Sequence, residues 1–494
     1  MDATEALRRA ARRWPAREAL RDDGGAVTFA ALDARADRLA RVLATRGVAR
    51  GDRVATLLPN AVAQVAAQMA ILRAGAAWVA INERLAAPEI GHMLADSGAR
   101  LLLTGGGAAP ACVEVEALDV GGADRDVEAA IARQPPGPPE VAVGEDDVAR
   151  LRYTSGTTGR PKAAVLTHRS ALTSLRSLLA ELHDLGPEDV VAHVAPLTHA
   201  SEALVAPAFW RGARGIVCAR FDAGALRDLI ARARVTTLFL VPTMIQALVD
   251  EPGIDADAFR SLRTVVYGAA PMPAELMERA LALFGPVLLQ IYGMSECPFP
   301  ITTLRKDDHL DPRLRGSCGL PTAASEVRVL DDAGRPAAAG TIGRIAVRGP
   351  QLMRGYWNDP AASAAALADG WLVSGDVGVL DDAGFLTLVD RSDDVIISGG
   401  FNVYPREVEV VLETHPAVVE AAVAAIAHPR WGQGVGAWVV RRPGAPGGTE
   451  AELIDFCRSR LAGYKKPLQV RFVDALPKNP TGKLLRRRLR DGEA

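Results

Sequence analysis

Cysteine is scarce in this chain of 494 residues, and its few copies are scattered. The five cysteines form no Cys-x-x-Cys pair, so the sequence predicts neither a metal–thiolate cluster nor a disulfide framework, and a reducing cytoplasm is the expected compartment. The arginine-rich segment 1–15 lacks the apolar core of a secretory signal. The mostly apolar run 418–427 is too short to span a bilayer, so no membrane partner is expected.

Lysine is also rare, because arginine supplies almost all of the positive charge. Six of the 57 basic residues are lysines, namely Lys162, Lys306, Lys465, Lys466, Lys478 and Lys483. An ammonium group is a compact point charge that a planar guanidinium does not replace, so these positions are candidates for chemistry. The 57 basic residues almost balance the 59 acidic ones, which gives no indication of a nucleic-acid partner.

The stretch 153–162 reads Tyr-Thr-Ser-Gly-Thr-Thr-Gly-Arg-Pro-Lys. Glycines let the backbone turn and present N–H groups to an anion, and hydroxyl groups donate to phosphate oxygens. The hydroxyl residues are Thr154, Ser155, Thr157 and Thr158, and the glycines are Gly156 and Gly159. Lys162 adds a positive charge, and the apolar residues at 148–151 and 165–166 predict a strand on each side. We therefore predict a phosphate-binding hairpin, which differs from the strand–loop–helix P-loop.

Helical and strand-like segments alternate over much of the chain. Residues 27–104 read as helix (29–46), strand (53–58), helix (61–74) and strand (77–81), and the alternation resumes over residues 190–290. Such alternation predicts an α/β fold with doubly wound sheets. The Pro- and Gly-rich stretch 134–140 is expected to be a surface connection, and residues 325–390 form a small β-rich subdomain with Asp-Ala-Gly turns.

A domain boundary is expected near residue 390. Beyond it, the sequence predicts a helix at 405–413 with proline in its first turn, strands at 418–426 and 436–440, and a helix at 450–461. These elements form a small α+β unit of about a hundred residues. We predict an N-terminal body of residues 1–390, a hinge at 391–394 and a C-terminal domain of residues 395–494.

Several later segments, taken with the stretch 153–162, resemble the motifs of the adenylate-forming superfamily. They are Tyr-Gly-Ala-Ala-Pro (267–271), Gln-Ile-Tyr-Gly-Met-Ser-Glu-Cys (290–297), Gly-Trp-Leu-Val-Ser-Gly-Asp (370–376), Asp-Arg-Ser-Asp-Asp (390–394) and Pro-Lys-Asn-Pro-Thr-Gly-Lys (477–483). The resemblance extends from about residue 10 to residue 490, and in our interpretation it is strongest toward acyl-CoA and aryl-CoA ligases such as the halobenzoate–CoA ligases. It implies ATP, Mg²⁺ and CoA as cofactors and a C-terminal domain that moves as a lid.

The resemblance implies an ATP site in which Tyr292 offers a flat face to adenine and Asp376 accepts from the ribose hydroxyls. The implied ATP-binding residues are Thr154, Ser155, Gly156, Thr157, Thr158, Gly159, Lys162, Gly268, Ala269, Ala270, Pro271, Gln290, Ile291, Tyr292, Gly293, Met294, Ser295, Asp376, Arg391 and Lys483. Two positions depart from the family pattern. Ser295 replaces the usual threonine and keeps its hydroxyl, and Asp390 stands where glycine is usual.

The catalytic residues implied by the resemblance are Lys483, His199, Glu296 and Thr157. Glu296 would be the ligand of Mg²⁺, which prefers one or two carboxylates plus phosphate oxygens. Lys483 would bridge the substrate carboxylate and the α-phosphate as charge develops. Asp393 matches the hinge position about which the lid turns between two half-reactions.

A thiolation half-reaction requires a CoA site. The implied CoA-binding residues are Arg84, Ser398, Gly399, Gly400, Trp431, Tyr464 and Lys466. Gly400 has no side chain to obstruct the tunnel through which pantetheine would pass. Trp431 and Arg84 can stack on or pair with the nucleotide part of CoA.

The expected acid pocket comprises His199, Ala200, Glu202, Gly293 and Met294, with His199 near the acyl carboxylate. No aspartate occurs between residues 194 and 201, which argues against an α-amino acid substrate. Glu202 has two interpretations. A carboxylate facing the pocket would need a cation or a donor and would indicate an acid with an amine or hydroxyl, whereas a solvent-facing helix start, which we favour, would have no such role.

The predicted function is an acid–thiol ligase that converts an aromatic or fatty carboxylic acid into an acyl-adenylate and then into a CoA thioester. One alternative is a stand-alone adenylating enzyme that passes the acyl group to a carrier protein or activates an unusual acid. Another is a non-catalytic adenylate-binding protein. A homodimer is the candidate assembly, although no motif addresses it.

Overall fold

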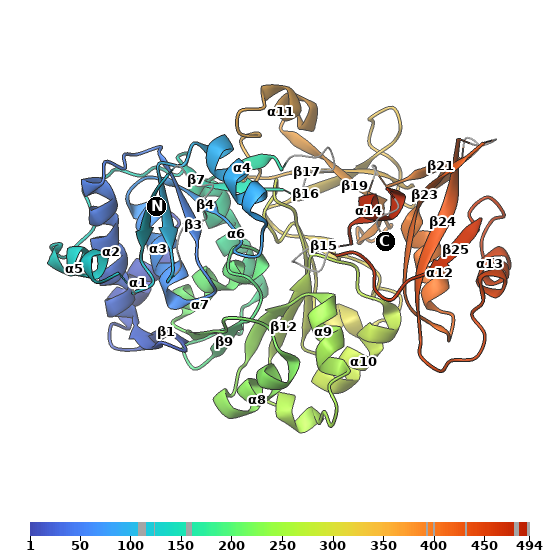
Figure 1. The fold of residues 1–494 in the computed structure, drawn as a ribbon, viewed down its shortest axis with the longest axis horizontal. Helices are drawn as coiled ribbons and strands as arrows, with labels where there is room; N and C mark the ends of the chain where they lie inside the picture. The colour runs from blue at the N-terminus through green and yellow to red at the C-terminus, as the bar shows by residue number, and fades with distance from the viewer. Residues whose placement is uncertain are drawn as a thin grey trace.

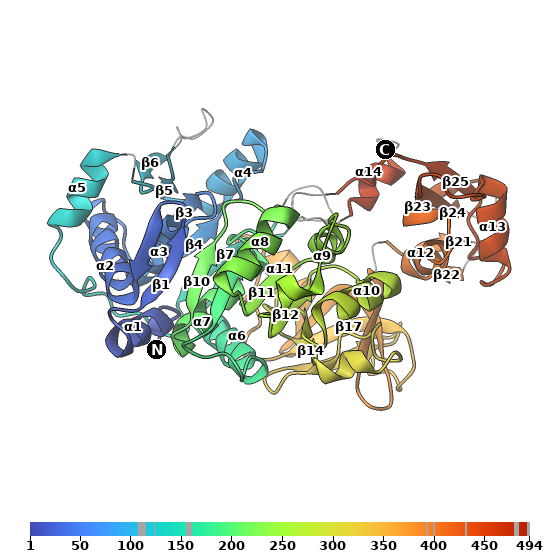
Figure 2. The same cartoon turned by 90° about the horizontal axis from the view of Figure 1, so that it is seen from below.

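The computed structural model describes residues 1–106, 115–122, 124–154, 161–391, 394–398, 401–429, 432–478 and 484–491 (Figure 1). Its described strands form four sheets, three in a large N-terminal part and one in a small C-terminal part. The C-terminal part, orange to red, lies at one end of the molecule in both views (Figures 1 and 2). The predicted fold class, an α/β body followed by a small α+β domain, is confirmed.

The first sheet has six strands in the order β6-β5-β3-β4-β7-β8. They are β3 (Arg53–Leu57), β4 (Ala77–Ala80), β5 (Leu101–Thr104), β6 (Glu116–Asp119), β7 (Val148–Tyr153) and β8 (Ala163–Thr167). The associated helices are α2 (Phe29–Thr45), α3 (Val62–Arg73), α4 (Ala87–Ser97), α5 (Arg125–Arg133) and α6 (His168–Glu181). Alternate strand residues pack on α2, α3 and α5 at one face and on α4 at the other. The sheet is therefore wound on both sides, as predicted.

The second sheet has nine strands in the order β15-β14-β13-β12-β11-β9-β10-β1-β2. They are β1 (Glu18–Asp22), β2 (Gly25–Thr28), β9 (Val190–His193), β10 (Arg214–Val217), β11 (Thr237–Leu240), β12 (Thr264–Gly268), β13 (Leu288–Tyr292), β14 (Thr302–Leu304) and β15 (Leu320–Pro321). Its helices are α1 (Glu5–Arg13), α7 (Val205–Arg211), α8 (Ala223–Ala233), α9 (Pro242–Val249), α10 (Ala274–Phe284) and the 3₁₀ helices η1 (Ala200–Leu204), η2 (Ala256–Phe259) and η3 (Asp307–Leu310).

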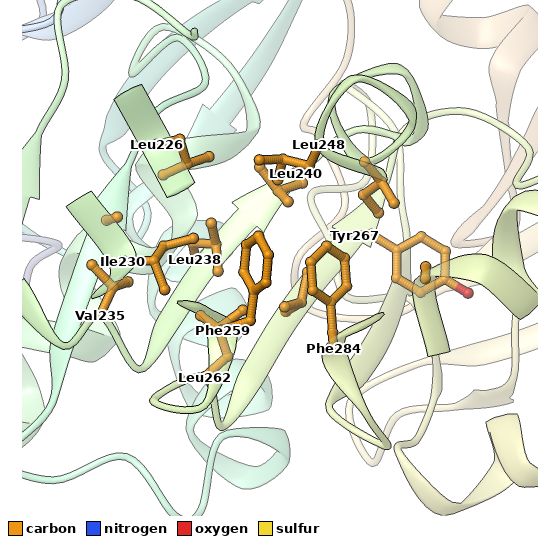
Figure 3. Packing of buried hydrophobic residues seen from close by; sticks show 14 of the residues in the cluster. Leu226, Ile230, Val235, Leu238, Leu240, Leu248, Phe259, Leu262, Tyr267 and Phe284 are labelled. Carbon is orange, nitrogen blue, oxygen red and sulfur yellow. The ribbon is translucent and has the colours of Figure 1, made fainter. Parts of the chain in front are cut away.

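The core of this sheet is aliphatic, with a few aromatic rings. Residues of α8, α9 and α10 pack on one face of the sheet, and Phe259 meets Phe284 edge to face at 5.0 Å between ring centroids (Figure 3). Helices α6 and α7 pack on the other face. The parallel strands β9 to β13 are therefore fixed from both sides, which positions the loops at their carboxyl ends.

The β-rich subdomain is a five-stranded sheet of β16 (Glu326–Leu330), β17 (Gly343–Arg348), β18 (Leu367–Ala368), β19 (Trp371–Leu380) and β20 (Leu386–Arg391). The short helix α11 (Pro360–Ala366) precedes β18 and has no counterpart in the sequence prediction.

The C-terminal sheet contains β21 (Ile396–Ser398), β22 (Phe401–Val403), β23 (Val418–His428), β24 (Gly432–Arg441) and β25 (Gln469–Phe472), with helices α12 (Pro405–Glu413), α13 (Glu450–Arg458) and α14 (Arg486–Arg490). The prediction of α12 is confirmed to the residue, while α13 ends three residues earlier than expected. The chain leaves the body sheet at Arg391 and joins the C-terminal sheet at Ile396. The hinge itself stays a prediction, because residues 392 and 393 lie outside the described part. No described helix is both long and apolar enough to cross a bilayer.

Candidate active site

The predicted phosphate-binding hairpin is present as a hairpin. Strands β7 and β8 pair antiparallel up to Tyr153 and Ala163, and the Thr154 N–H donates to the Lys162 carbonyl at 2.8 Å. The Lys162 ammonium pairs with Asp359 at 3.1 Å and lies 5.6 Å from the ring centroid of Tyr356. The remaining predicted phosphate ligands, Ser155, Gly156, Thr157, Thr158 and Gly159, lie outside the described residues.

Two segments predicted to contact adenine lie side by side. Strands β12 and β13 are parallel neighbours, and their last pairs are Tyr267–Gln290 and Gly268–Ile291. A Cβ at Gly268 would lie 2.3 Å from the Ile291 carbonyl oxygen, so only glycine fits there. Ala269 follows with a φ of 68°, which turns the chain away from the strand. The loop 268–271 and the segment 290–295 thus meet at the carboxyl edge of the sheet, where α/β proteins bind ligands.

The predicted ribose ligand lies against the predicted adenine platform. The Tyr292 hydroxyl donates to Oδ2 of Asp376 at 2.7 Å. Burial and the neighbouring Asp376 carboxylate raise the pKa of Tyr292 well above its ordinary value, so the phenol stays protonated and donates. Asp376 also faces Arg391 across the β19–β20 ladder, although the Arg391 side chain is outside the description. Tertiary structure therefore joins three predicted nucleotide residues.

Glu296, the predicted metal ligand, is held by a residue that sequence reasoning missed. The Tyr356 hydroxyl donates to Oε1 of Glu296 at 2.8 Å, and the same ring lies beside Lys162. Tyr356 is therefore in contact with both ends of the expected phosphate site. One sequence signal could have identified it: Tyr356 is followed by Trp357, and such a pair is unusual in a chain with six tyrosines and seven tryptophans.

The carboxylate oxygens present fit a magnesium ion whose other ligands are mainly phosphate oxygens. Oε2 of Glu296 accepts no hydrogen bond from the described residues, and in that part of the chain no group of three metal-ligating side chains occurs. Mg²⁺ takes one or two protein carboxylates and completes its shell with phosphate oxygens and water. One free carboxylate oxygen beside the hairpin matches that requirement.

The favoured interpretation of Glu202 as solvent-facing is wrong. Glu202 does lie at a helix start, in η1, but its carboxylate pairs with the Arg150 guanidinium at 2.9 Å and accepts from the Gln68 amide at 2.8 Å. Arg150 is buried, stacks 4.3 Å from the centroid of the Trp78 ring and donates to the Thr198 carbonyl at 2.8 Å. The cation that Glu202 requires comes from the protein, which removes the argument for a substrate amine or hydroxyl at this position.

His199 lies beside this ion pair. Its Nδ1 is 2.9 Å from the Thr198 hydroxyl. Burial, together with the positive charges of Arg152 and Arg150, lowers the pKa of His199 to about 3. His199 is therefore a neutral hydrogen-bonding group at physiological pH. Gly293 and Met294, also predicted for the acid pocket, follow β13, and a Cβ on Gly293 would lie 2.5 Å from Cβ of Phe299.

The predicted CoA residues are divided between the two parts of the chain. Arg84 follows β4 and lines a small polar cleft with Asn82 and Thr198. Ser398 is buried on β21, and the exposed Tyr464 and half-buried Lys466 precede β25. Gly399, Gly400 and Trp431 lie outside the described residues, as do Asp393 and Lys483.

Comparisons with known proteins decide the family. The family model described as "AMP-binding enzyme" matches residues 7–357, and that of the "AMP-binding enzyme C-terminal domain" matches residues 407–483. The chain belongs to the AMP-binding enzymes. Among curated relatives, a feruloyl-CoA synthase from an Amycolatopsis species is 41% identical over 98% of this chain and 97% of its own. A 2-succinylbenzoate–CoA ligase from Geobacillus kaustophilus is 39% identical over 96% and 95%.

Solved AMP-binding enzymes share the whole architecture. The ATP-bound MatB from Rhodopseudomonas palustris superposes with a TM-score of 0.91 at 31% identity, covering 100% of this chain and 99% of that one. An o-succinylbenzoate CoA synthetase from Bacillus subtilis, in complex with its acyl-adenylate, gives a TM-score of 0.87 at 34% identity over 98% and 97%. This chain is accordingly an AMP-forming acid–CoA ligase, as predicted. The expected kinship with halobenzoate–CoA ligases is corrected by the feruloyl- and succinylbenzoate-specific names of these relatives.

Proposed function

We propose that this AMP-binding enzyme carries out both half-reactions at the junction of the hairpin, the carboxyl ends of β12 and β13, and the C-terminal domain. One observation carries the proposal: Tyr356 contacts both Lys162 and Glu296, while Tyr292 contacts Asp376. These contacts support one nucleotide site with Lys162 as the phosphate-binding cation, Glu296 as the metal ligand and Asp376 as the ribose acceptor.

In the first half-reaction, a carboxylate oxygen of the acid attacks the α-phosphorus of ATP, and the bond to pyrophosphate breaks. Thr154 and Lys162 hold the leaving phosphates, together with the hydroxyls of the loop between them. Lys483 neutralises charge that develops between carboxylate and α-phosphate, and catalysis consists of positioning and electrostatic stabilisation. Glu296 would hold Mg²⁺, which adds charge neutralisation at the phosphates when bound.

In the second half-reaction, the CoA thiolate attacks the acyl carbonyl and AMP leaves. A turn of the C-terminal domain about Asp393 would exchange Lys483 for the segment 398–400, whose glycines leave room for pantetheine. Arg84 would meet the nucleotide end of CoA with Trp431, Tyr464 and Lys466. Alternate use of one site by two sets of groups explains why a domain must move.

We place aromatic acids first as substrates, because a relative with 41% identity is named feruloyl-CoA synthase, and fatty acids second. His199, neutral at physiological pH, would donate a hydrogen bond from its ring N–H to the acid carboxylate, with Ala200, Gly293 and Met294 as pocket neighbours. A homodimer remains the proposed assembly.

Pyrophosphate release tests this function. Benzoates, cinnamates, fatty acids and dicarboxylic acids are each supplied with ATP and Mg²⁺, with and without CoA, and the thioester is measured in parallel. Acid-dependent release that rises with CoA is expected. Release with no CoA dependence would favour a carrier protein as acceptor, a role named for a Streptomyces coeruleorubidus relative with 35% identity. No release with any acid would overturn the proposal.

A further inference from the structure

Strand β7 places two arginines on one face of the six-stranded sheet. Arg150 and Arg152 are two residues apart, and successive strand residues point to opposite faces, so both side chains project to the same side. Tyr153 points the other way, and its hydroxyl donates to Asp96 at 2.7 Å. The arginines face η1 and the acid pocket, because Arg150 binds Glu202 and the charge of Arg152 acts on His199.

The two arginines differ in their partners. Arg150 is neutralised by Glu202 and also donates to the Thr198 carbonyl. For Arg152, the described residues provide no hydrogen bond and no ion pair. Its guanidinium lies 5.9 Å from the ring centroid of Phe299, which in turn packs against Gly293 of the expected acid pocket. The Arg152 guanidinium therefore lies near Phe299, acts electrostatically on His199, and keeps hydrogen-bond donors that no described residue uses.

Among the described residues, Arg152 has no carboxylate of its own once Glu202 is assigned to Arg150 and Glu296 to a metal ion. Arg150, Glu202 and Glu296 are the charged groups that act on it. Glu202 is engaged by Arg150, and Glu296 would be engaged by a metal ion. Burial, reinforced by the Arg150 charge, lowers the pKa of Arg152 to about 10, so it stays charged at neutral pH. A partly buried cation without a partner is costly, and a ligand oxyanion would offset that cost.

We propose that Arg152 is the anion-binding residue of the acid pocket, and that it takes an oxyanion of the acid substrate. The inference rests on the proposed function and narrows its substrate class to small acids and to acids with a second carboxylate. The oxyanion has two sources: the reacting carboxylate of a small acid, or the second carboxylate of a dicarboxylic acid. An acid that is apolar beyond its carboxyl group and too long to bring that group to Arg152 would leave the guanidinium unpaired. Such an acid is expected to be a poor substrate.

Steady-state pyrophosphate release from Arg152→Met and Arg152→Lys tests the inference. The panel contains matched acids: acetate and propionate, cinnamate with 4-methylcinnamate and 4-carboxycinnamate, and hexanoate with adipate. Arg313→Met is the control, because Arg313 is a highly exposed arginine paired with Asp311. Hydrogen bonds to charged groups contribute roughly 1.5–3 kcal/mol, so KM for the preferred acid should rise about 10- to 100-fold in Arg152→Met, with a smaller rise in Arg152→Lys.

The pattern across the panel identifies the source of the oxyanion. A KM increase confined to 4-carboxycinnamate and adipate assigns Arg152 to a second carboxylate, and an increase for acetate and propionate assigns it to the reacting one. An unchanged KM for every acid, with kcat also unchanged, would overturn the inference while leaving the ligase function intact. Absence of release in the wild type would instead overturn the ligase function. Thermal melting of each variant, with and without the preferred acid, separates misfolding from lost binding, because the wild type and Arg313→Met should gain stability from the acid and Arg152→Met should not.

Discussion

The Tyr292 hydroxyl donates to the Asp376 carboxylate at 2.7 Å, which joins the nine-stranded sheet to the β-rich subdomain. Removing that hydroxyl in Tyr292→Phe keeps the ring but takes one hydrogen bond from the carboxylate expected to hold the ribose. Because one hydrogen bond contributes about 1 kcal/mol, KM for ATP should rise about fivefold with little change in kcat. Tyr267→Phe is the control, since its hydroxyl meets His309 instead. An equal rise in both variants would contradict the ribose role.

Lys483→Ala should separate the two half-reactions. Loss of a preorganised electrostatic contact costs about 100- to 1,000-fold in rate, so acid-dependent pyrophosphate release should fall by that factor. Thioester formation from a supplied acyl-adenylate should stay within a fewfold of wild type. Lys478→Ala, which breaks only a surface ion pair with Glu420, is the matched control. Equal loss of both half-reactions in Lys483→Ala would exclude the exchange of residues by lid rotation.

Glu202→Gln should destabilise the body of the protein. The substitution leaves the buried Arg150 guanidinium without its carboxylate, and losing one partner of a largely buried pair costs roughly 2–4 kcal/mol after allowance for partial exposure of Glu202. The melting temperature should fall by several degrees. Glu326→Gln breaks an exposed pair with Arg348 and should change it little. Similar melting of both variants would show that the Arg150–Glu202 pair contributes no special stability.

Gly293→Ala should impair the acid pocket. An added Cβ would lie 2.5 Å from Cβ and 2.6 Å from Cα of Phe299, so the Phe299 backbone must move. We expect kcat/KM for the acid to drop at least about tenfold, since misplacement of a site wall by 1 Å can cost about 100-fold. Gly316→Ala is the control, because nothing lies within 4 Å of its added Cβ. Full activity in Gly293→Ala would mean that Phe299 lies outside the pocket.

Two buried histidines predict how stability depends on pH. Burial lowers the pKa of His193 to about 4, and that of His199 lies at about 3, whereas an unfolded histidine has a pKa of about 6.5. Between these values the unfolded chain binds protons that the folded chain does not. These histidines therefore do not reduce the free energy of unfolding above pH 6.5, and they lower it progressively as pH falls toward 4.

Thermal melting between pH 8 and pH 4.5 measures this dependence. The loss of melting temperature on acidification should be smaller in His193→Gln, which removes one of the buried histidines with a lowered pKa, than in wild type. His183→Gln, at an exposed position, should retain the wild-type slope. An identical slope in His193→Gln and wild type would show that protonation of His193 does not contribute.

The sequence predicted the bounds of an element correctly where a local signal marks its end. Helix α12 begins at Pro405, which favours a first helical turn, and it was placed to the residue. Strand β24 was predicted too short, because the Gly-rich stretch 432–436 reads as a loop. Pairing with β23 over its full length overrides that low intrinsic preference. Sheet pairing is a tertiary effect that a local pattern does not contain.

The motifs predicted the nucleotide residues but not the residues that hold them in place. Glu202 was misread because its partner Arg150 is 52 residues away in the chain and no local pattern links them. Tyr356 was missed for the same reason, since it is 60 residues from Glu296. A motif shows which residues meet the substrate, whereas the residues that hold them in place come from distant segments and are known only after folding.

Tyr356 has a thermodynamic consequence. Its ring lies beside Lys162, its hydroxyl donates to Glu296, and its backbone forms a bridge with Ala164 on β8. One residue therefore contacts both the phosphate hairpin and the expected metal ligand. We expect a shift of the hairpin on nucleotide binding to move the Glu296 carboxylate through these contacts. Linkage is reciprocal, so an ion held by Glu296 would favour nucleotide binding by the same factor by which nucleotide favours the ion. We therefore expect the ion and the nucleotide each to bind more tightly in the presence of the other than alone.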